Sequence, residues 1–82
     1  MDDKREDQRH RTLKAGLIVF NERRSTIECT IRNLSDSGAQ LKVATVIGIP
    51  DSFELRNVSD GTDHRCEVAW RREGVVGVRF VD

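Results

Sequence analysis

The stretch 13–32 reads LKAGLIVFNERRSTIECTIR and decides the fold of this chain. Its first part alternates along an extended backbone, one face being Leu13, Ala15, Leu17 and Val19 and the other Ile18 and Phe20. Its last part alternates apolar with polar positions, and the apolar face is Ile27, Cys29 and Ile31. A period of two residues is typical of β-strands. The charged segment between the two parts, residues 21–25, is typical of a turn, so the stretch predicts two strands joined by a turn.

The same period continues to the end of the chain. Four further apolar sets follow: Ala39, Leu41 and Val43; Phe53 and Leu55; Cys66, Val68 and Trp70; Val76, Val78 and Phe80. Turn residues separate them, and Asp60-Gly61 is the strongest hairpin signal. No window of ten residues has helical period. We therefore expect an all-β fold, a small six-stranded antiparallel barrel of Greek-key-like type with no C-terminal helix, because closure removes exposed strand edges.

Length and composition narrow the classes of function. The 82 residues allow one small domain. Since 14 basic and 14 acidic side chains cancel, charge-driven binding to duplex DNA is not expected. No apolar run is long enough for a membrane helix, and the polar start predicts no secretory signal, so we expect a cytoplasmic protein of bacterial type. We expect residues 1–11 to form a flexible arm, because no apolar side chain follows Met1, and residues 12–82 to form the barrel.

The sequence gives no support for catalysis. His10 and His64 lie in polar stretches without a nucleophile or a second ligand at a known spacing, and we expect both to be solvated. The carboxylates are scattered among arginines, and no glycine-rich phosphate loop is present. We therefore expect no enzyme, no metal and no cofactor. Cys29 and Cys66 are too few for a disulfide scaffold and are expected as buried free thiols.

Two short patterns remain after these exclusions. Arg5-Glu6-Asp7-Gln8-Arg9 spaces two arginines by three residues, and Asn33-Leu34-Ser35-Asp36-Ser37-Gly38 reads Asn-x-Ser-x-x-Gly after the second expected strand. In this order, ahead of Val68-Ala69-Trp70-Arg71 and Gly77-Val78-Arg79-Phe80, they make the chain resemble the PilZ domain family from about Arg5 to Phe80. The resemblance implies a receptor for cyclic di-GMP that uses these two motifs to bind its ligand.

Carried over residue by residue, the resemblance implies a ligand-binding set of Arg5, Arg9, Asn33, Ser35 and Gly38. Arg11 is an alternative second arginine, but its spacing partner would be Asp7, so Arg9 is preferred. An arginine fork can bond O6 and N7 of guanine, stack on the base or hold a phosphate. Asn33 offers an amide to a guanine edge and Ser35 a hydroxyl, while Gly38 permits a positive φ and a close approach of the ligand.

Structural interpretations of the same residues stay open at this point. Residues 33–38 are also typical of a strand-ending turn. A solvated charged tail is the alternative interpretation of Arg5 and Arg9. We expect Trp70 in the core beside Val68, and a rim position that stacks on a guanine is the alternative that makes it a further candidate for the site. The remaining arginines near the C-terminus are expected on the exposed face: Arg71, Arg72 and Arg79.

The expected function is that of a receptor or adaptor whose arm becomes ordered when cyclic di-GMP binds. With a single domain, the signal has to pass to a separate, unidentified protein, and the resemblance implies regulation of motility, exopolysaccharide synthesis or biofilm behaviour. A monomer without membrane insertion or DNA binding is expected. The alternative is a PilZ-like interaction module that does not bind nucleotide. A barrel for single-stranded nucleic acid is disfavoured by the small number of aromatic residues.

Overall fold

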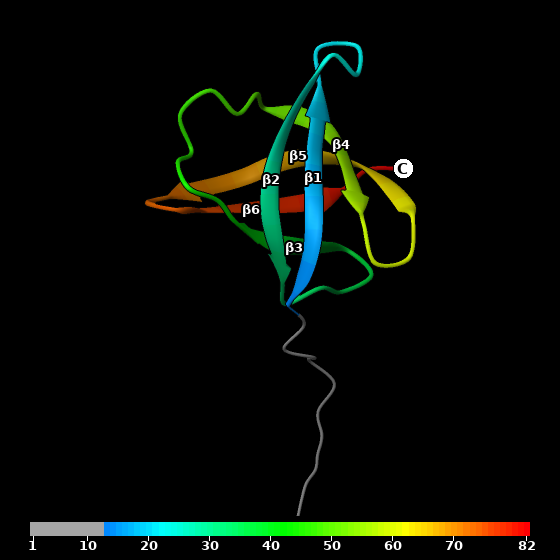
Figure 1. Cartoon of the computed structure of the whole chain (residues 1–82). Helices are drawn as coiled ribbons and strands as arrows, with labels where there is room; N and C mark the ends of the chain where they lie inside the picture. The colour runs from blue at the N-terminus through cyan, green and yellow to red at the C-terminus, as the bar shows by residue number, and fades with distance from the viewer. Residues whose placement is uncertain (1–12) are drawn as a thin grey trace, which may run out of the picture.

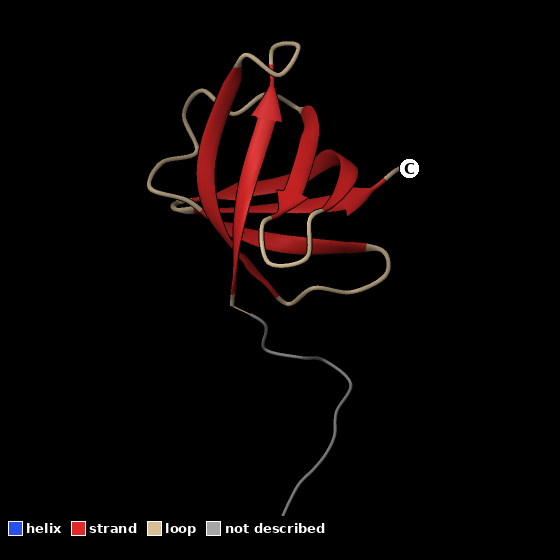
Figure 2. Ribbon diagram, turned by 45° about the vertical axis from the view of Figure 1, so that its right-hand side comes forward, coloured by secondary structure: helices blue, strands red, loops and turns tan. Residues whose placement is uncertain are grey.

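The computed structural model describes residues 13–82, which form six strands and no helix (Figures 1 and 2). The strands are β1 (Lys14–Phe20), β2 (Ser25–Arg32), β3 (Gly38–Lys42), β4 (Ser52–Asn57), β5 (Thr62–Arg72) and β6 (Val75–Phe80). The expected flexible arm and its motif lie outside the described residues. The prediction of six short strands from alternating apolar residues is confirmed.

The strands close into one antiparallel barrel in the order β1-β2-β3-β6-β5-β4. Each half of the chain is a three-stranded meander, and the connection between β3 and β4 brings the halves together. Two pairings between strands distant in sequence then close the ring: β1 with β4, and β3 with β6. In Figure 1, β5 and β6 cross behind β1 and β2. The buried core contains residues of both halves, such as Ile18 and Val76. Because every strand has two neighbours, the barrel exposes no free edge.

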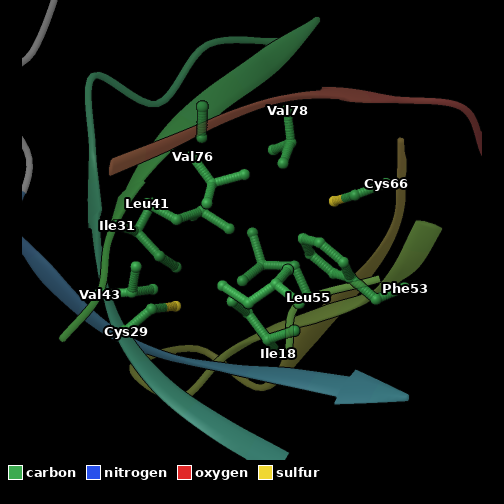
Figure 3. Close-up of a cluster of buried hydrophobic side chains, with 12 residues drawn as sticks. Ile18, Cys29, Ile31, Leu41, Val43, Phe53, Leu55, Cys66, Val76 and Val78 are labelled. Atoms are coloured by element: carbon green, nitrogen blue, oxygen red, sulfur yellow. The ribbon is translucent and has the colours of Figure 1, made fainter. Parts of the chain in front are cut away.

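The core consists of the inward side of each strand (Figure 3). Ile18, Ile31, Leu41, Leu55 and Val76 have 0–1% of their surface exposed and point toward one another. On β1 the inward face is therefore that of Ile18, whereas Leu13 on the other face is 74% exposed. Burial of a side chain of this size contributes about 1.5–3 kcal/mol. With so few large core residues, each is a sizeable part of the stability of the barrel.

Trp70 departs from the sequence interpretation. It is 37% exposed and lies outside the core, so the expectation of core packing is wrong. The reason is a β-bulge in β5: Val68 pairs with Val78 and Trp70 with the adjacent Gly77, which leaves Ala69 as an extra residue. One added residue turns every following side chain to the opposite face of the sheet. The alternation that placed Trp70 beside Val68 therefore ends at Val68.

Both cysteines are buried, and His64 is partly buried. Cys29 and Cys66 are buried and free, as predicted. His64 is not fully solvated, because its ring stacks on Phe80 with centroids 4.2 Å apart and its Nδ1 lies 3.5 Å from Asp82 Oδ2. No helix of the described part is long and apolar enough to cross a membrane.

Candidate functional site

A surface hollow of about 300 Å³ collects most of the predicted site residues of the barrel. One side comes from the loop between β2 and β3, with Asn33 and Ser35, and from Gly38 at the start of β3. The other side comes from β5 and β6, with Trp70 and Arg79. These segments are far apart in sequence. The pairing of β3 with β6 and the bulge in β5 bring them side by side.

The loop 33–38 is held together by the hydroxyl of Ser35. Its Oγ accepts hydrogen bonds from the backbone N–H groups of Ser37 and Gly38, each at 3.3 Å, and lies 3.2 Å from the Gly38 carbonyl oxygen. The backbone N–H of Ser35 donates to the same carbonyl at 2.9 Å. This is the local side-chain-to-backbone bonding that stabilises serine-rich turns. Ser35 thus has a structural role, because its hydroxyl holds the turn that lines the hollow.

Asn33 has the strained backbone of the loop. Its φ is 51°, in the left-handed region that Asn tolerates better than most residues with a side chain. Its Nδ2 donates to Oε1 of Gln40 at 3.0 Å across the β2–β3 pair. That bond uses one N–H of Nδ2, and no hydrogen bond to Oδ1 or to the second N–H is formed by the described residues. Gln40 therefore fixes the orientation of the amide.

Gly38 is required for a different reason from the expected one. Its φ is not in the left-handed region, so the expectation of a positive φ at this residue is wrong. Instead, a Cβ on Gly38 would collide with the carbonyl oxygen of Val78 and lie 3.1 Å from Cα of Arg79. The glycine allows β6 to pack closely against β3. Gly38 also lines the hollow.

Trp70 forms the opposite wall. Its indole lies directly over Gly77, where an added Cβ would overlap the ring. The guanidinium of Arg72 lies 5.1 Å from the centroid of the indole, within cation–π range. The ring is thus supported by a glycine and an arginine while it lines the hollow. The hollow is therefore lined by an aromatic side chain, the type that stacks on other planar rings.

Arg79 is the charged residue of the wall. It pairs with Gly38 on one side and with Glu67 on the other in the strand register. Its Nη2 donates to Oε1 of Glu67 at 2.8 Å, and the two side chains are 67% and 47% exposed. The ion pair therefore lies at the surface, where solvent screens it strongly.

The structure thus brings Asn33, Ser35, Gly38 and Trp70 together, as a shared site requires. The predicted Arg5, Arg9 and Arg11 lie outside the described residues. Sequence reasoning missed Gln40, Gly77 and the placement of Arg79, because their proximity to the hollow depends on strand register. The sequence alone marks the run Gly77-Val78-Arg79-Phe80 only as part of the resemblance to the family.

Two other hollows of the surface lack the predicted site residues of the barrel. A hollow of about 730 Å³ lies beside Ala15, Thr30 and Val58. Another of about 510 Å³ lies near the β1–β2 turn. Neither hollow is lined by a described residue of the two sequence motifs.

Among residues 13–82 no three His, Cys, Asp or Glu side chains gather as metal ligands do. Desolvation raises the pKa of the Cys29 thiol to about 11, so this thiol stays protonated and is a poor nucleophile near neutral pH.

Comparison with known proteins assigns the family. No curated protein and no solved structure gives a significant match. A family model described as PilZ domain matches residues 3–82, which includes both sequence motifs and all six strands. The closed all-β barrel and the hollow at the second motif agree with that match. The chain therefore belongs to the PilZ domain family, a family of ligand-binding domains that act as receptors for cyclic di-GMP.

Proposed function

We propose that this protein is a cyclic di-GMP receptor and that the hollow between the β2–β3 loop and β5–β6 is its ligand site. The observation that carries the proposal is the meeting of Asn33, Ser35 and Gly38 with Trp70 around one hollow. These residues come from segments that the sequence separates by more than thirty positions. If residues 33–38 formed only a strand-ending turn, the presence of Trp70 on the opposite side of the hollow would have no explanation.

The residues of the hollow suit a guanine nucleotide. The indole of Trp70 can stack on a base, a contact worth about 1–3 kcal/mol in nucleic-acid complexes. Oδ1 of Asn33 can accept a hydrogen bond from the N1 or N2 groups of guanine. In this proposal Arg5 and Arg9 close over the ligand from the N-terminal arm and bind its phosphates or the O6 and N7 edge.

The proposed output is a change of the arm. Ligand binding orders residues 1–11 on the barrel and changes the charge presented to a separate protein. Motility and exopolysaccharide synthesis are the processes that the family relationship suggests for that partner. The cytoplasm is the proposed location, and the protein is proposed to act as a monomer without DNA binding or membrane insertion.

Titration with cyclic di-GMP tests the proposal. Trp70 is the only tryptophan and the chain has no tyrosine, so its fluorescence reports directly on the hollow. We expect cyclic di-GMP to quench this emission and to bind in calorimetry at one fixed salt concentration. Cyclic di-AMP has the same charge but lacks the donor and acceptor pattern of guanine, so we expect it to bind far more weakly. No binding of either nucleotide would favour the nucleotide-independent interaction module.

Variants of the arm complete this test. We expect Arg5→Ala and Arg9→Ala each to weaken binding by about ten- to a hundredfold, the loss of one charge-assisted contact. Urea unfolding should stay within about 0.5 kcal/mol of the parent chain, as is usual for surface residues. A loss of affinity in Arg11→Ala alone would instead assign the second motif position to Arg11.

A further inference from the structure

The hollow has one ionisable side chain on its wall in the described part of the chain. Of the described residues that line it, only Arg79 carries a charge, and the other polar liners are amides and hydroxyls, such as Asn33, Ser35 and Gln40. Cyclic di-GMP carries two negatively charged phosphates. Among the described residues that line the hollow, Arg79 is therefore the cationic group that an anionic ligand would meet, and it comes from β6.

The strand register places Arg79 beside the start of β3. It lies opposite Gly38, and both residues line the hollow. On its other side lies Glu67 of β5, which accepts the bond from Nη2 at 2.8 Å. That bond engages one side of the guanidinium fork. The fork has five N–H donors, so it can bind a second acceptor while it holds the first.

Because the ion pair is exposed, Arg79 can exchange Glu67 for another acceptor at a small cost in free energy. Both side chains are substantially exposed, at 67% and 47%, and a pair of this kind contributes little to stability. A phosphate offers the fork two oxygens in the bidentate geometry that arginine binds best. Glu67, in contrast, places a negative charge 2.8 Å from the same guanidinium. The carboxylate therefore orients the guanidinium in the free protein and opposes the ligand at the same time.

We propose that Arg79 is a ligand-contacting residue that binds a phosphate of the cyclic dinucleotide, and that Glu67 is a positioning residue that weakens this binding. The proposal rests on the proposed function of the hollow and adds a third arginine, on the barrel wall, to the two of the arm. It also gives the two partners of one ion pair opposite effects on affinity. A purely structural pair would give both substitutions the same effect.

Calorimetric titration of four variants with cyclic di-GMP tests this proposal. We expect Arg79→Ala to weaken binding about tenfold, the loss of one charge-assisted contact, and Arg79→Lys to recover part of it as a point charge. We expect Glu67→Gln to tighten binding severalfold at low salt and less at high salt. Arg56→Ala is the matched control, because Arg56 also holds a carboxylate at 2.8 Å, that of Asp63, but does not line the hollow. Its affinity should equal that of the parent chain.

The double variant Arg79→Ala with Glu67→Gln removes the main ambiguity. Arg79→Ala alone leaves Glu67 unpaired, and repulsion by Glu67 could then weaken binding without any contact from Arg79. If Arg79 contacts the phosphate, the double variant binds about tenfold more weakly than Glu67→Gln. If the two bind equally, the proposed contact is wrong even though the parent chain binds. Absence of binding by the parent chain itself would overturn the proposed function instead.

Discussion

Gly38 and Gly77 both line the hollow, but a side chain added at each would meet different atoms. A Cβ on Gly38 would meet backbone, the Val78 carbonyl of the paired strand, whereas a Cβ on Gly77 would meet the indole of Trp70. A backbone cannot move without disturbing the β3–β6 ladder. An exposed indole can turn away. The same substitution therefore has different consequences at the two positions.

We expect Gly38→Ala to lower the free energy of unfolding by about 1–3 kcal/mol, the range for forced overpacking. Gly77→Ala should change it much less, but should displace Trp70 and shift its fluorescence maximum. Urea unfolding and emission spectra of both variants measure these effects. Gly61→Ala is the comparison, because its methyl meets nothing but its φ of 76° costs about 1–2 kcal/mol. Equal stability of the parent chain and Gly38→Ala would contradict the close packing of β3 against β6.

The loop 33–38 combines structural and ligand-facing groups in six residues. Ser35 holds the turn through its hydrogen bonds to Ser37 and Gly38, whereas the Asn33 amide bonds only to Gln40 among the described residues. The two positions can therefore be tested separately. A replacement at Asn33 should keep the left-handed backbone, and glycine does so without strain.

We expect Ser35→Ala to cost about 0.5–1.5 kcal/mol, because the backbone N–H groups of the turn lose their acceptor. In a chain of this length a loss of 1 kcal/mol lowers the melting temperature by about 4–8 °C. Asn33→Gly should leave the melting temperature nearly unchanged and weaken cyclic di-GMP binding, which a thermal melt and a titration of each variant would measure. Unchanged affinity in Asn33→Gly would remove the proposed role of its amide.

The elements of this fold were more predictable from sequence than the site was. Alternation of apolar residues predicts each strand, because a half-buried strand needs one apolar face. The same rule fails at Trp70, since the bulge at Ala69 shifts the period by one residue and no local signal marks it. The Asn-x-Ser-x-x-Gly motif predicts one wall of the hollow. The opposite wall depends on the pairing of β3 with β6, which joins residues about forty positions apart.

At the scale of the whole molecule, closure of the barrel buries two thiols in a small core. Desolvation raises the pKa of Cys29 from 9.0 to about 11. Desolvation, with a smaller effect of the Asp82 carboxylate, raises the pKa of Cys66 to about 12. In the unfolded chain both thiols ionise near their ordinary pKa. The native state therefore binds protons that the unfolded state releases above about pH 9.

This difference predicts a loss of stability in alkaline solution. A raised native pKa contributes stability that is fully present below the unfolded pKa of about 9 and is lost as the pH rises toward the native values. Each thiol can lower the free energy of unfolding by roughly 1 kcal/mol per pH unit in that interval. The chain has no tyrosine and only three lysines, so its composition offers few other side-chain types that ordinarily ionise in that interval.

Urea unfolding between pH 7 and pH 10.5, followed by Trp70 fluorescence, measures this effect. We expect a plateau up to about pH 8.5 and a steady decline above it. A variant with Cys29→Ala and Cys66→Ala should be less stable at pH 7, because two core side chains become smaller. Its stability should nevertheless change much less between pH 8.5 and pH 10.5. An equally steep decline without the thiols would assign the alkaline loss to the lysines, and burial of Cys29 and Cys66 would then have no part in it.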